Sequence, residues 1–93
     1  MTKILIAEDD PEIAMLERDY LEIEGFEVSV VDNGQQAVTQ ALTGDFGLIL
    51  LDLMLPGCNG YDVCRLIRDR IDVPILMVTG GTEWVAKMRG VGL

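Results

Sequence analysis

The chain has 93 residues, a length that suits one domain and leaves no room for a second catalytic or effector unit within it. Hydrophobic residues make up 49% of the chain and charged residues 25%, with only 3 prolines, a composition typical of a globular domain and not of a disordered chain. The formal net charge of −9 repels phosphate backbones and anionic membrane surfaces. We therefore expect no direct binding to nucleic acid or to a membrane, and a cation or a basic partner instead.

The cysteines and the apolar segments indicate a cytoplasmic protein. Cys58 and Cys64 stand six residues apart in a chain without histidine, a pattern that fits neither a zinc site nor a disulfide framework, so reduced thiols are expected. The N-terminus lacks the pattern of a secretion leader. The longest apolar segment, residues 46–55, is interrupted by Asp52 and is too short to span a membrane.

Four apolar segments with strand character alternate with segments of helical periodicity, which predicts β-α-β units and a parallel sheet. The strands are expected at residues 4–7, 28–31, 48–51 and 75–78. The third strand is apolar without alternation, as in a strand that is covered on both faces, and is placed in the middle of the sheet. Right-handed crossovers then give a flavodoxin-like, doubly wound α/β fold with strand order 2-1-3-4.

Three helices are expected between these strands. The first has Asp10 as its N-cap, Pro11 at its first position and Gly25 at its end. The second covers residues 34–42 and the third residues 60–70. Their apolar positions predict the following core contacts: Ile13, Leu16, Tyr20 and Ile23 in the first helix; Ala37, Val38, Ala41 and Leu42 in the second; Val63, Leu66 and Ile67 in the third.

Acidic and hydroxyl side chains follow three of the predicted strands. Glu8 and Asp9 come directly after the first strand, Asp52 after the third, and Thr79 after the fourth. Ligands of such sheets bind beyond the carboxyl ends of the strands, at the point where the strand order reverses. The three carboxylates and the hydroxyl are therefore expected to converge on one rim, while Asp10 is explained by its capping role.

Crowded carboxylates raise one another's pKa unless a cation or a proton lies between them. A set of ligands made of oxygen alone, without histidine or cysteine, indicates a hard cation such as Mg²⁺. Magnesium implies phosphate chemistry, in which a carboxylate beside the metal can act as a nucleophile toward phosphorus. Asp52 is the candidate nucleophile, and Thr79 is a candidate hydrogen-bond donor to a phosphoryl oxygen. Taken alone, Glu8 and Asp9 would fit an ordinary solvated acidic turn equally well.

Three segments resemble the receiver domain of two-component response regulators. They are ILIAEDD at residues 4–10, LLDLMLPG at residues 50–57 with Gly60 eight positions after Asp52, and PILMVT at residues 74–79. Each segment alone is a weak signal, but all three occur in order and on the expected strand ends. The resemblance covers the whole chain and implies a phosphoacceptor signalling domain, not an enzyme, apart from self-catalysed phosphorylation and dephosphorylation.

The resemblance also implies a role for each site residue. Asp52 would accept a phosphoryl group from a histidine of a sensor kinase, in a reaction that depends on Mg²⁺. Asp9 would bind the metal directly together with Asp52, Glu8 would act through water, and the backbone carbonyl of Met54 would complete the protein ligands. Thr79 would be the switch hydroxyl. The sequence is most similar to regulators of transcription with a winged-helix DNA-binding output, which this chain does not encode.

The chain departs from the family toward its end. Members of the family continue into a fifth strand, which carries a lysine that pairs with the phosphoryl group, and a fifth helix. We therefore expect residues 1–93 to form a receiver domain that is incomplete at its C-terminus, in which Lys87 is no evident substitute for that lysine. The strand at residues 75–78 would then be an open edge without a charge, and we expect self-association through it.

Three other interpretations remain open at this point. A phosphatase of the haloacid dehalogenase type uses the same aspartyl chemistry, but it needs a second aspartate where this chain has Met54. A flavin or nucleotide binder on the same fold would need a glycine-rich loop after the first strand, where this chain is acidic. The third is a receiver fragment that keeps the fold but does not signal.

Overall fold

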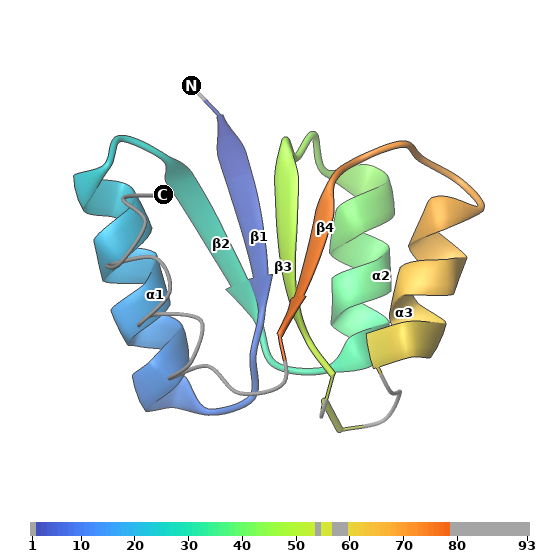
Figure 1. Ribbon diagram of the computed structural model, residues 1–93, viewed down its shortest axis with the longest axis horizontal. Helices are drawn as coiled ribbons and strands as arrows, with labels where there is room; N and C mark the ends of the chain where they lie inside the picture. Colours follow the sequence, from blue (N-terminus) through green and yellow to red (C-terminus); the bar gives the residue numbers. More distant parts are fainter. Residues whose placement is uncertain (1, 54, 57–59, 79–93) are drawn as a thin grey trace.

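The computed structural model describes residues 2–53, 55–56 and 60–78, which form a parallel four-stranded sheet with the order β2-β1-β3-β4 (Figure 1). This arrangement confirms the predicted fold class and strand order. The elements are β1 (Lys3–Ala7), α1 (Pro11–Ile23), β2 (Glu27–Val31), α2 (Gly34–Thr43), β3 (Leu48–Asp52), α3 (Gly60–Arg68) and β4 (Ile75–Val78). The expectations about Thr79, about Lys87 and about the C-terminal end of the receiver domain concern residues 79–93, which lie outside the described residues.

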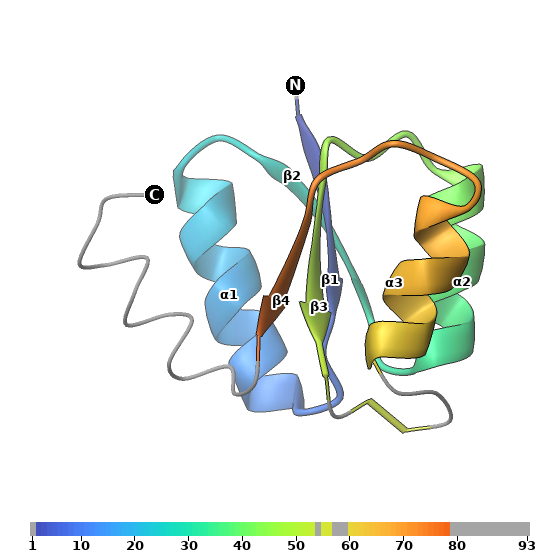
Figure 2. The same ribbon diagram turned by 45° about the vertical axis from the view of Figure 1, so that its right-hand side comes forward.

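Helices cover both faces of the sheet. Helix α1 lies on one face, and α2 and α3 lie side by side on the other (Figure 2). Alternate residues of the inner strands divide the core accordingly. Leu5, Ile49 and Leu51 pack toward α2 and α3, whereas Ile6 and Leu50 pack in the cluster that contains Leu21 of α1. Strand β3 is buried on both faces, as its unbroken apolar sequence predicted.

The boundaries of α1 follow the predicted capping signals. The Asp10 side chain accepts hydrogen bonds from the backbone N–H groups of Glu12 and Ile13, at 2.9 and 3.3 Å, and Pro11 occupies the first turn. Gly25 follows the helix with a φ of +96°, a left-handed conformation that glycine adopts without strain. The cap also fixes where the chain leaves β1, because it lies only two residues beyond Glu8.

The predicted core face of α1 was confirmed at Tyr20, which packs against the cluster that contains Leu21, and was wrong at Leu16 and Ile23. The structure buries Ala14, Glu17 and Leu21, whereas Leu16 is 42% exposed and Ile23 is 83% exposed. Both sets have the i, i+3, i+7 spacing of one helix face, so periodicity alone does not choose between them. The larger apolar side chains of α1 favour one face, but packing against the sheet selects the face that contains Glu17.

Helices α2 and α3 follow their predicted patterns with one exception. Ala37 and Ala41 of α2, and Val63 and Ile67 of α3, are buried in the core that the two helices share with the sheet. Leu66, also predicted to face the core, is half exposed. Val63 and Ile67, at i, i+4 spacing, form a narrow buried stripe, and Leu66 lies beside this stripe and not within it.

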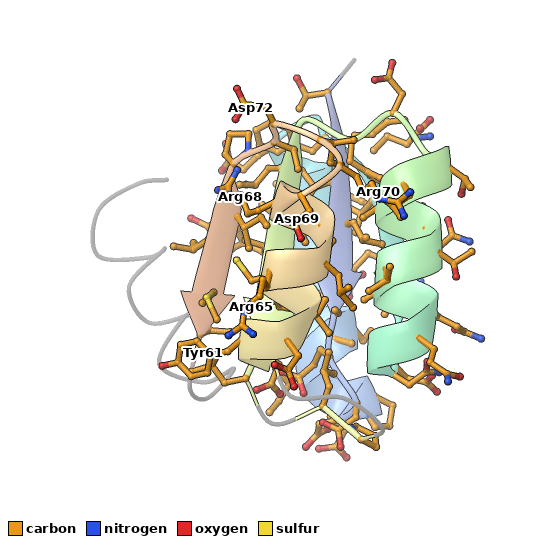
Figure 3. All side chains as sticks on the ribbon, turned by 90° about the vertical axis from the view of Figure 1, so that its right-hand side faces the viewer. Tyr61, Arg65, Arg68, Asp69, Arg70 and Asp72 are labelled. Atoms are coloured by element: carbon orange, nitrogen blue, oxygen red, sulfur yellow. The ribbon has the colours of Figure 1, made fainter. Side chains whose placement is uncertain are left out.

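An arginine holds the connection from α3 to β4. The Arg68 Nη1 donates a hydrogen bond to the backbone carbonyl of Val73 at 2.5 Å and lies 3.8 Å from an Asp72 carboxylate oxygen. Figure 3 shows Arg68 and Asp72 together at this loop. Val73 itself is buried against the core. These contacts fix the entry into β4 and so help to place its carboxyl end beside that of β3.

No helix of the described part of the chain is long and apolar enough to cross a membrane.

Glu17 is a carboxyl group at the centre of the buried face of α1, where it is only 1% exposed. Burial and, to a smaller extent, the charges of Glu8 and Asp52 together raise the pKa of Glu17 from 4.5 to about 8. The protonated form of Glu17 is therefore favoured in the folded protein at neutral pH. Because the protonated side chain carries no charge, the layer between α1 and the sheet can hold a glutamate.

Substitution of Glu17 tests this interpretation through the pH dependence of stability. The folded pKa of about 8 lies above the unfolded value of 4.5, so the contribution of Glu17 to stability is complete below pH 4.5 and is lost as the pH rises to about 8. We expect Glu17→Leu to remove this part of the dependence and to raise the free energy of unfolding at pH 8 by about 1 to 3 kcal/mol. Urea unfolding between pH 5 and pH 9 measures both effects. Glu22→Leu, on the exposed side of α1, is the control. Equal pH profiles of the free energy of unfolding for the wild type and Glu17→Leu would contradict this interpretation.

Candidate metal centre

Three carboxylates meet at the carboxyl ends of the two central strands. Glu8 and Asp9 follow β1 directly, and Asp52 is the last residue of β3. The strands pair in parallel with Ala7 opposite Leu51, so their ends lie level. One carboxylate oxygen from each of the three residues lies within 4.8 Å of those of the other two. The structure thus brings together the acidic residues that the sequence predicted to converge.

The two inner carboxylates of this cluster are buried and the outer one is exposed. Glu8 is 4% exposed and Asp52 is 6% exposed, whereas Asp9 faces solvent. The backbone N–H of Glu8 donates to the carbonyl of Val31 at 3.0 Å, which extends the pairing of β1 with β2 by one residue. This backbone bond fixes the position of Glu8 at the end of β1. The cluster is therefore buried at Glu8 and Asp52 and open to solvent at Asp9.

The Glu8 carboxylate is only partly satisfied by hydrogen bonds. Its Oε2 accepts a hydrogen bond from the backbone N–H of Asp10 at 3.1 Å. Its Oε1 is buried and, among the described residues, has no hydrogen-bond partner. A buried carboxylate oxygen in this state is costly, and a cation beside it would remove the cost.

The electrostatics of the cluster indicate the same requirement. The pKa of Glu8 is raised from 4.5 to about 7, mainly by burial; the N–H of Asp10 lowers it, and the charge and hydrogen bonding of the Asp52 side chain and the charge of Asp9 raise it. Near neutral pH, Glu8 is thus poised between holding a proton and standing as a second buried negative charge beside Asp52. A divalent cation would stabilise the ionised form.

The donor atoms fit Mg²⁺. All three groups offer carboxylate oxygens, the described part of the cluster includes no histidine or thiol, and Mg²⁺ prefers oxygen ligands and uses few protein carboxylates while keeping several waters. The exposed Asp9 leaves room for such waters. The fit therefore rests on ligand type, on the spacing of the oxygens and on the burial of Glu8 and Asp52.

Two other predicted site residues, Met54 and Thr79, lie outside the described residues, so their predicted roles stay predictions. The backbone that leads into each of them is described, up to Leu53 and Val78. The N–H of Leu53 donates to the carbonyl of Val78 at 3.0 Å, so the chain that leads to residue 54 runs beside the chain that leads to residue 79. This pairing is consistent with a loop and a strand end that border one site.

Gly60 closes the loop that follows Asp52. Its N–H donates to the carbonyl of Leu53 at 3.1 Å. A Cβ at this position would lie 2.7 Å from the Leu53 Cα and 3.0 Å from the Asp52 carbonyl oxygen, which real Cβ atoms do not do without a shift of the backbone. The start of α3 thus packs directly on the backbone of the phosphoacceptor candidate. The sequence marked Gly60 only by its spacing from Asp52.

Within residues 2–53, 55–56 and 60–78, Glu17 is an acidic residue near this cluster that the sequence did not indicate. The charges of Glu8 and Asp52 contribute to its raised pKa, so Glu17, on the buried face of α1, interacts electrostatically with the cluster. Its signal in the sequence, a glutamate at i+3 from Ala14 and i−4 from Leu21, is visible only once the true buried face of α1 is known.

Comparison with known proteins settles the family. The response regulator receiver domain family matches residues 4–92. The chain belongs to this family. It is 42% identical to the transcriptional regulatory protein ResD of Bacillus subtilis over 89 residues, 96% of the chain and 37% of ResD. It is 44% identical to the DNA-binding response regulator MtrA of Mycolicibacterium smegmatis over 88 residues, 95% of the chain and 39% of MtrA. This receiver domain thus spans less than two-fifths of the length of either relative.

Solved structures agree with this assignment. A chain in the crystal structure of the histidine kinase ThkA in complex with the response regulator TrrA has a TM-score of 0.81 and 33% identity, covering 86% of this receiver domain and 70% of that chain. The receiver domain of the sensor histidine kinase PA1611 from Pseudomonas aeruginosa has a TM-score of 0.78 and 32% identity, covering 88% and 74% of the two chains. That structure has a magnesium ion coordinated in the active site cleft.

Mg²⁺ is expected to stabilise the receiver domain through the acidic cluster. At about 100 times its dissociation constant, a ligand that binds only the folded state raises the free energy of unfolding by about 2.7 kcal/mol. Asp9→Asn and Asp52→Asn should lose most of this gain, whereas Asp52→Asn without Mg²⁺ should be more stable than the wild type because one repulsive charge is gone. Thermal unfolding with and without Mg²⁺ measures both, with Asp45→Asn, exposed before the amino end of β3, as the control. The same gain in all four proteins would place the ion elsewhere.

The close approach at Gly60 gives a second prediction. Gly60→Ala should lower the free energy of unfolding by about 1 to 3 kcal/mol, because the new methyl group meets the backbone of residues 52 and 53. Gly47→Ala is the matched control, since its Cβ would first meet the flexible end of the Thr2 side chain and should change stability by less than about 0.5 kcal/mol. Chemical denaturation compares the two variants, and equal losses would argue against backbone contact as the cause.

Proposed function

We propose that this receiver domain accepts a phosphoryl group on Asp52 from a phosphohistidine of a sensor kinase. A carboxylate oxygen of Asp52 would form the new P–O bond while the P–N bond to the imidazole breaks, and the imidazole leaves with the electron pair of that bond. The observation that supports this most strongly is the convergence of the Glu8, Asp9 and Asp52 carboxylates at the end of the central strand. Asp52 is the member of this cluster that stands on the sheet itself.

The other site residues would prepare Asp52 and respond to its modification. Asp9 and Asp52 would bind Mg²⁺ directly with the backbone carbonyl of Met54, and Glu8 would act through water. When bound, Mg²⁺ supplies positive charge that offsets the phosphoryl oxygens and the carboxylates. Thr79 would donate a hydrogen bond to a phosphoryl oxygen, and its movement would shift the population of the domain toward an active form. The burial of Glu8 and the exposure of Asp9 support this division of roles.

The comparisons support a partner on each side of the phosphorylation step. TrrA is a response regulator in complex with a histidine kinase, and MtrA is described as a DNA-binding response regulator. By analogy, we propose a cytoplasmic sensor–regulator pair in which a histidine kinase loads Asp52 and a winged-helix output domain carries the signal to DNA. The receiver domain itself, at a net charge of −9, is not suited to contact DNA directly.

Self-catalysed reactions are part of the proposal, and turnover of an external substrate is not. A haloacid-dehalogenase-type phosphatase is not favoured by any contact of the described residues, and the family assignment argues for a regulator. The self-association expected through the edge at residues 75–78 stays a prediction, which the Leu76→Cys crosslink described below tests.

Phosphorylation by a small donor tests the function. Incubation of the chain with acetyl phosphate and Mg²⁺ should add the mass of one phosphoryl group, and Asp52→Asn should abolish the gain because the nucleophile is gone. Asp9→Asn should reduce the rate at least about tenfold, while Asp45→Asn should react like the wild type. Intact-protein mass spectrometry over time gives all four rates.

Two results of this experiment would count against the proposal. A phosphoryl group that persists in Asp52→Asn would show that another residue is the acceptor. A complete absence of modification in folded protein that binds Mg²⁺ would favour the interpretation that the chain keeps the receiver fold without its signalling chemistry.

A further inference from the structure

Strand β2 forms one outer edge of the described sheet, and half of its backbone groups point away from β1. The N–H of Glu27 donates to the carbonyl of Thr2, and the carbonyl of Val31 accepts from the N–H of Glu8, at 3.0 Å in both cases. In a parallel pair, alternate residues direct both of their backbone groups to the same side. The N–H and C=O groups of Val28 and Val30 therefore face outward, ready to pair with a further strand.

A groove without charged side chains runs beside this edge. It has a volume of about 710 Å³ and lies between β2 and α2, where Ser29, Gln36, Thr39 and Gln40 contribute to its lining. Helix α2 packs over β1 and against α3, which leaves the groove open on the side of β2. In a chain with a net charge of −9, an uncharged amide and hydroxyl surface next to an open strand edge is where two like-charged molecules approach at least electrostatic cost.

The edge also lacks the usual devices that prevent pairing. Edge strands are commonly blunted by proline, by lysine or by a charge in their centre. Strand β2 has none of these at its three central positions, which are Val28, Ser29 and Val30, and Val30 is 39% exposed. Its acidic flanks, Glu27 at the first position and Asp32 just after the last, stand at the two ends.

From these features we propose that β2 pairs antiparallel with β2 of a second copy of the chain, across a two-fold axis that passes beside Ser29. Val28 of each copy would then exchange hydrogen bonds with Val30 of the other, which uses every outward backbone group of the strand centre. Ser29 would lie opposite Ser29 of the second copy, in a non-hydrogen-bonded pair. The two sheets would become one continuous sheet, with the two amide-lined grooves on the same face.

The occupant is inferred from charge and symmetry. In this register Glu27 lies opposite Val31 of the second copy and Asp32 lies opposite Phe26, so Glu27 and Asp32 of different copies stand one position apart, with their side chains on opposite faces of the sheet. The two Glu27 residues would stand four positions apart along the strand direction, about 13 Å at about 3.3 Å per residue, which is beyond the screening length in physiological salt. Two-fold pairing of like edges is also the commonest form of assembly between identical chains. The proposal does not depend on the proposed phosphoacceptor function, because it uses no residue of the metal centre.

A cysteine at the two-fold axis tests the register. Opposite residues of a non-hydrogen-bonded antiparallel pair have Cα atoms about 4.5 Å apart, within the range that a disulfide spans. In a chain with Cys58 and Cys64 replaced by serine, Ser29→Cys should form a disulfide-linked dimer under mild oxidation, at least about tenfold faster than a cysteine at exposed Gln35. Leu76→Cys reports on pairing through the β4 edge instead, because Leu76 lies between the outward-facing residues 75 and 77 of β4 as Ser29 lies between Val28 and Val30 of β2.

A charge placed on the edge tests the association without a crosslink. Val30→Lys should abolish the concentration-dependent dimer in analytical ultracentrifugation, although it reduces the net negative charge. Leu16→Lys makes the same change of charge at a residue of similar exposure on α1 and should leave the dimer intact. The wild-type dimer should strengthen with added salt, because screening weakens the repulsion between two acidic chains.

The outcomes separate the alternatives. A chain that is monomeric at all concentrations and at high salt, a crosslink at residue 76 but not at residue 29, or a dimer that survives Val30→Lys would each overturn the proposal. Should Val30→Lys fail to fold, as judged by circular dichroism, the crosslinking rates at residues 29 and 35 decide the question. Because phosphorylation of Asp52 is measured separately, failure here leaves the function of the metal centre unaffected.

Discussion

Repulsion between carboxylates at the ends of β1 and β3 is the constraint around which this domain is built. Glu8 and Asp52 are both almost fully buried, and an oxygen of each lies within 4.8 Å of the other and of Asp9. Two such groups cannot both stay ionised there without a compensating charge, which the raised pKa of Glu8 expresses. A stable core does not require this arrangement. The repulsion lowers the free energy of unfolding, and the packing of the rest of the fold must offset it.

The fold supplies the means to hold these groups together. Parallel pairing brings the ends of β1 and β3 level, and the position of β3 between β1 and β4 gives Asp52 a rigid base that is covered on both faces. The backbone contact of Gly60 with residues 52 and 53 then fixes where the next loop departs. Loops carry the more adaptable parts of the site, while the nucleophile candidate stands on a strand, where its position is determined most firmly.

Most of the fold and the location of the site were predictable from the sequence, for physical reasons that are local. Apolar runs without alternation mark inner strands, and Asp10, Pro11 and Gly25 mark the limits of α1 through groups that satisfy or avoid backbone hydrogen bonds. Convergence of Glu8, Asp9 and Asp52 followed because parallel strands share one carboxyl end. The buried face of α1 was not predictable, since two stripes with the same spacing compete and only packing against the sheet selects the one with Glu17. The unpaired Glu8 Oε1 likewise arises from tertiary contacts.

Asp10 performs two tasks at once, and this gives α1 a direct mechanical link to the site. Its side chain receives the first free N–H groups of the helix, while its own N–H holds the Oε2 of Glu8. Any tilt or fraying of the first turn of α1 would therefore move Asp10 and change its hydrogen bond to the Glu8 carboxylate. A protein that docks on α1 could in this way sense whether the acidic cluster is filled, or alter how readily it fills, without touching the cluster itself.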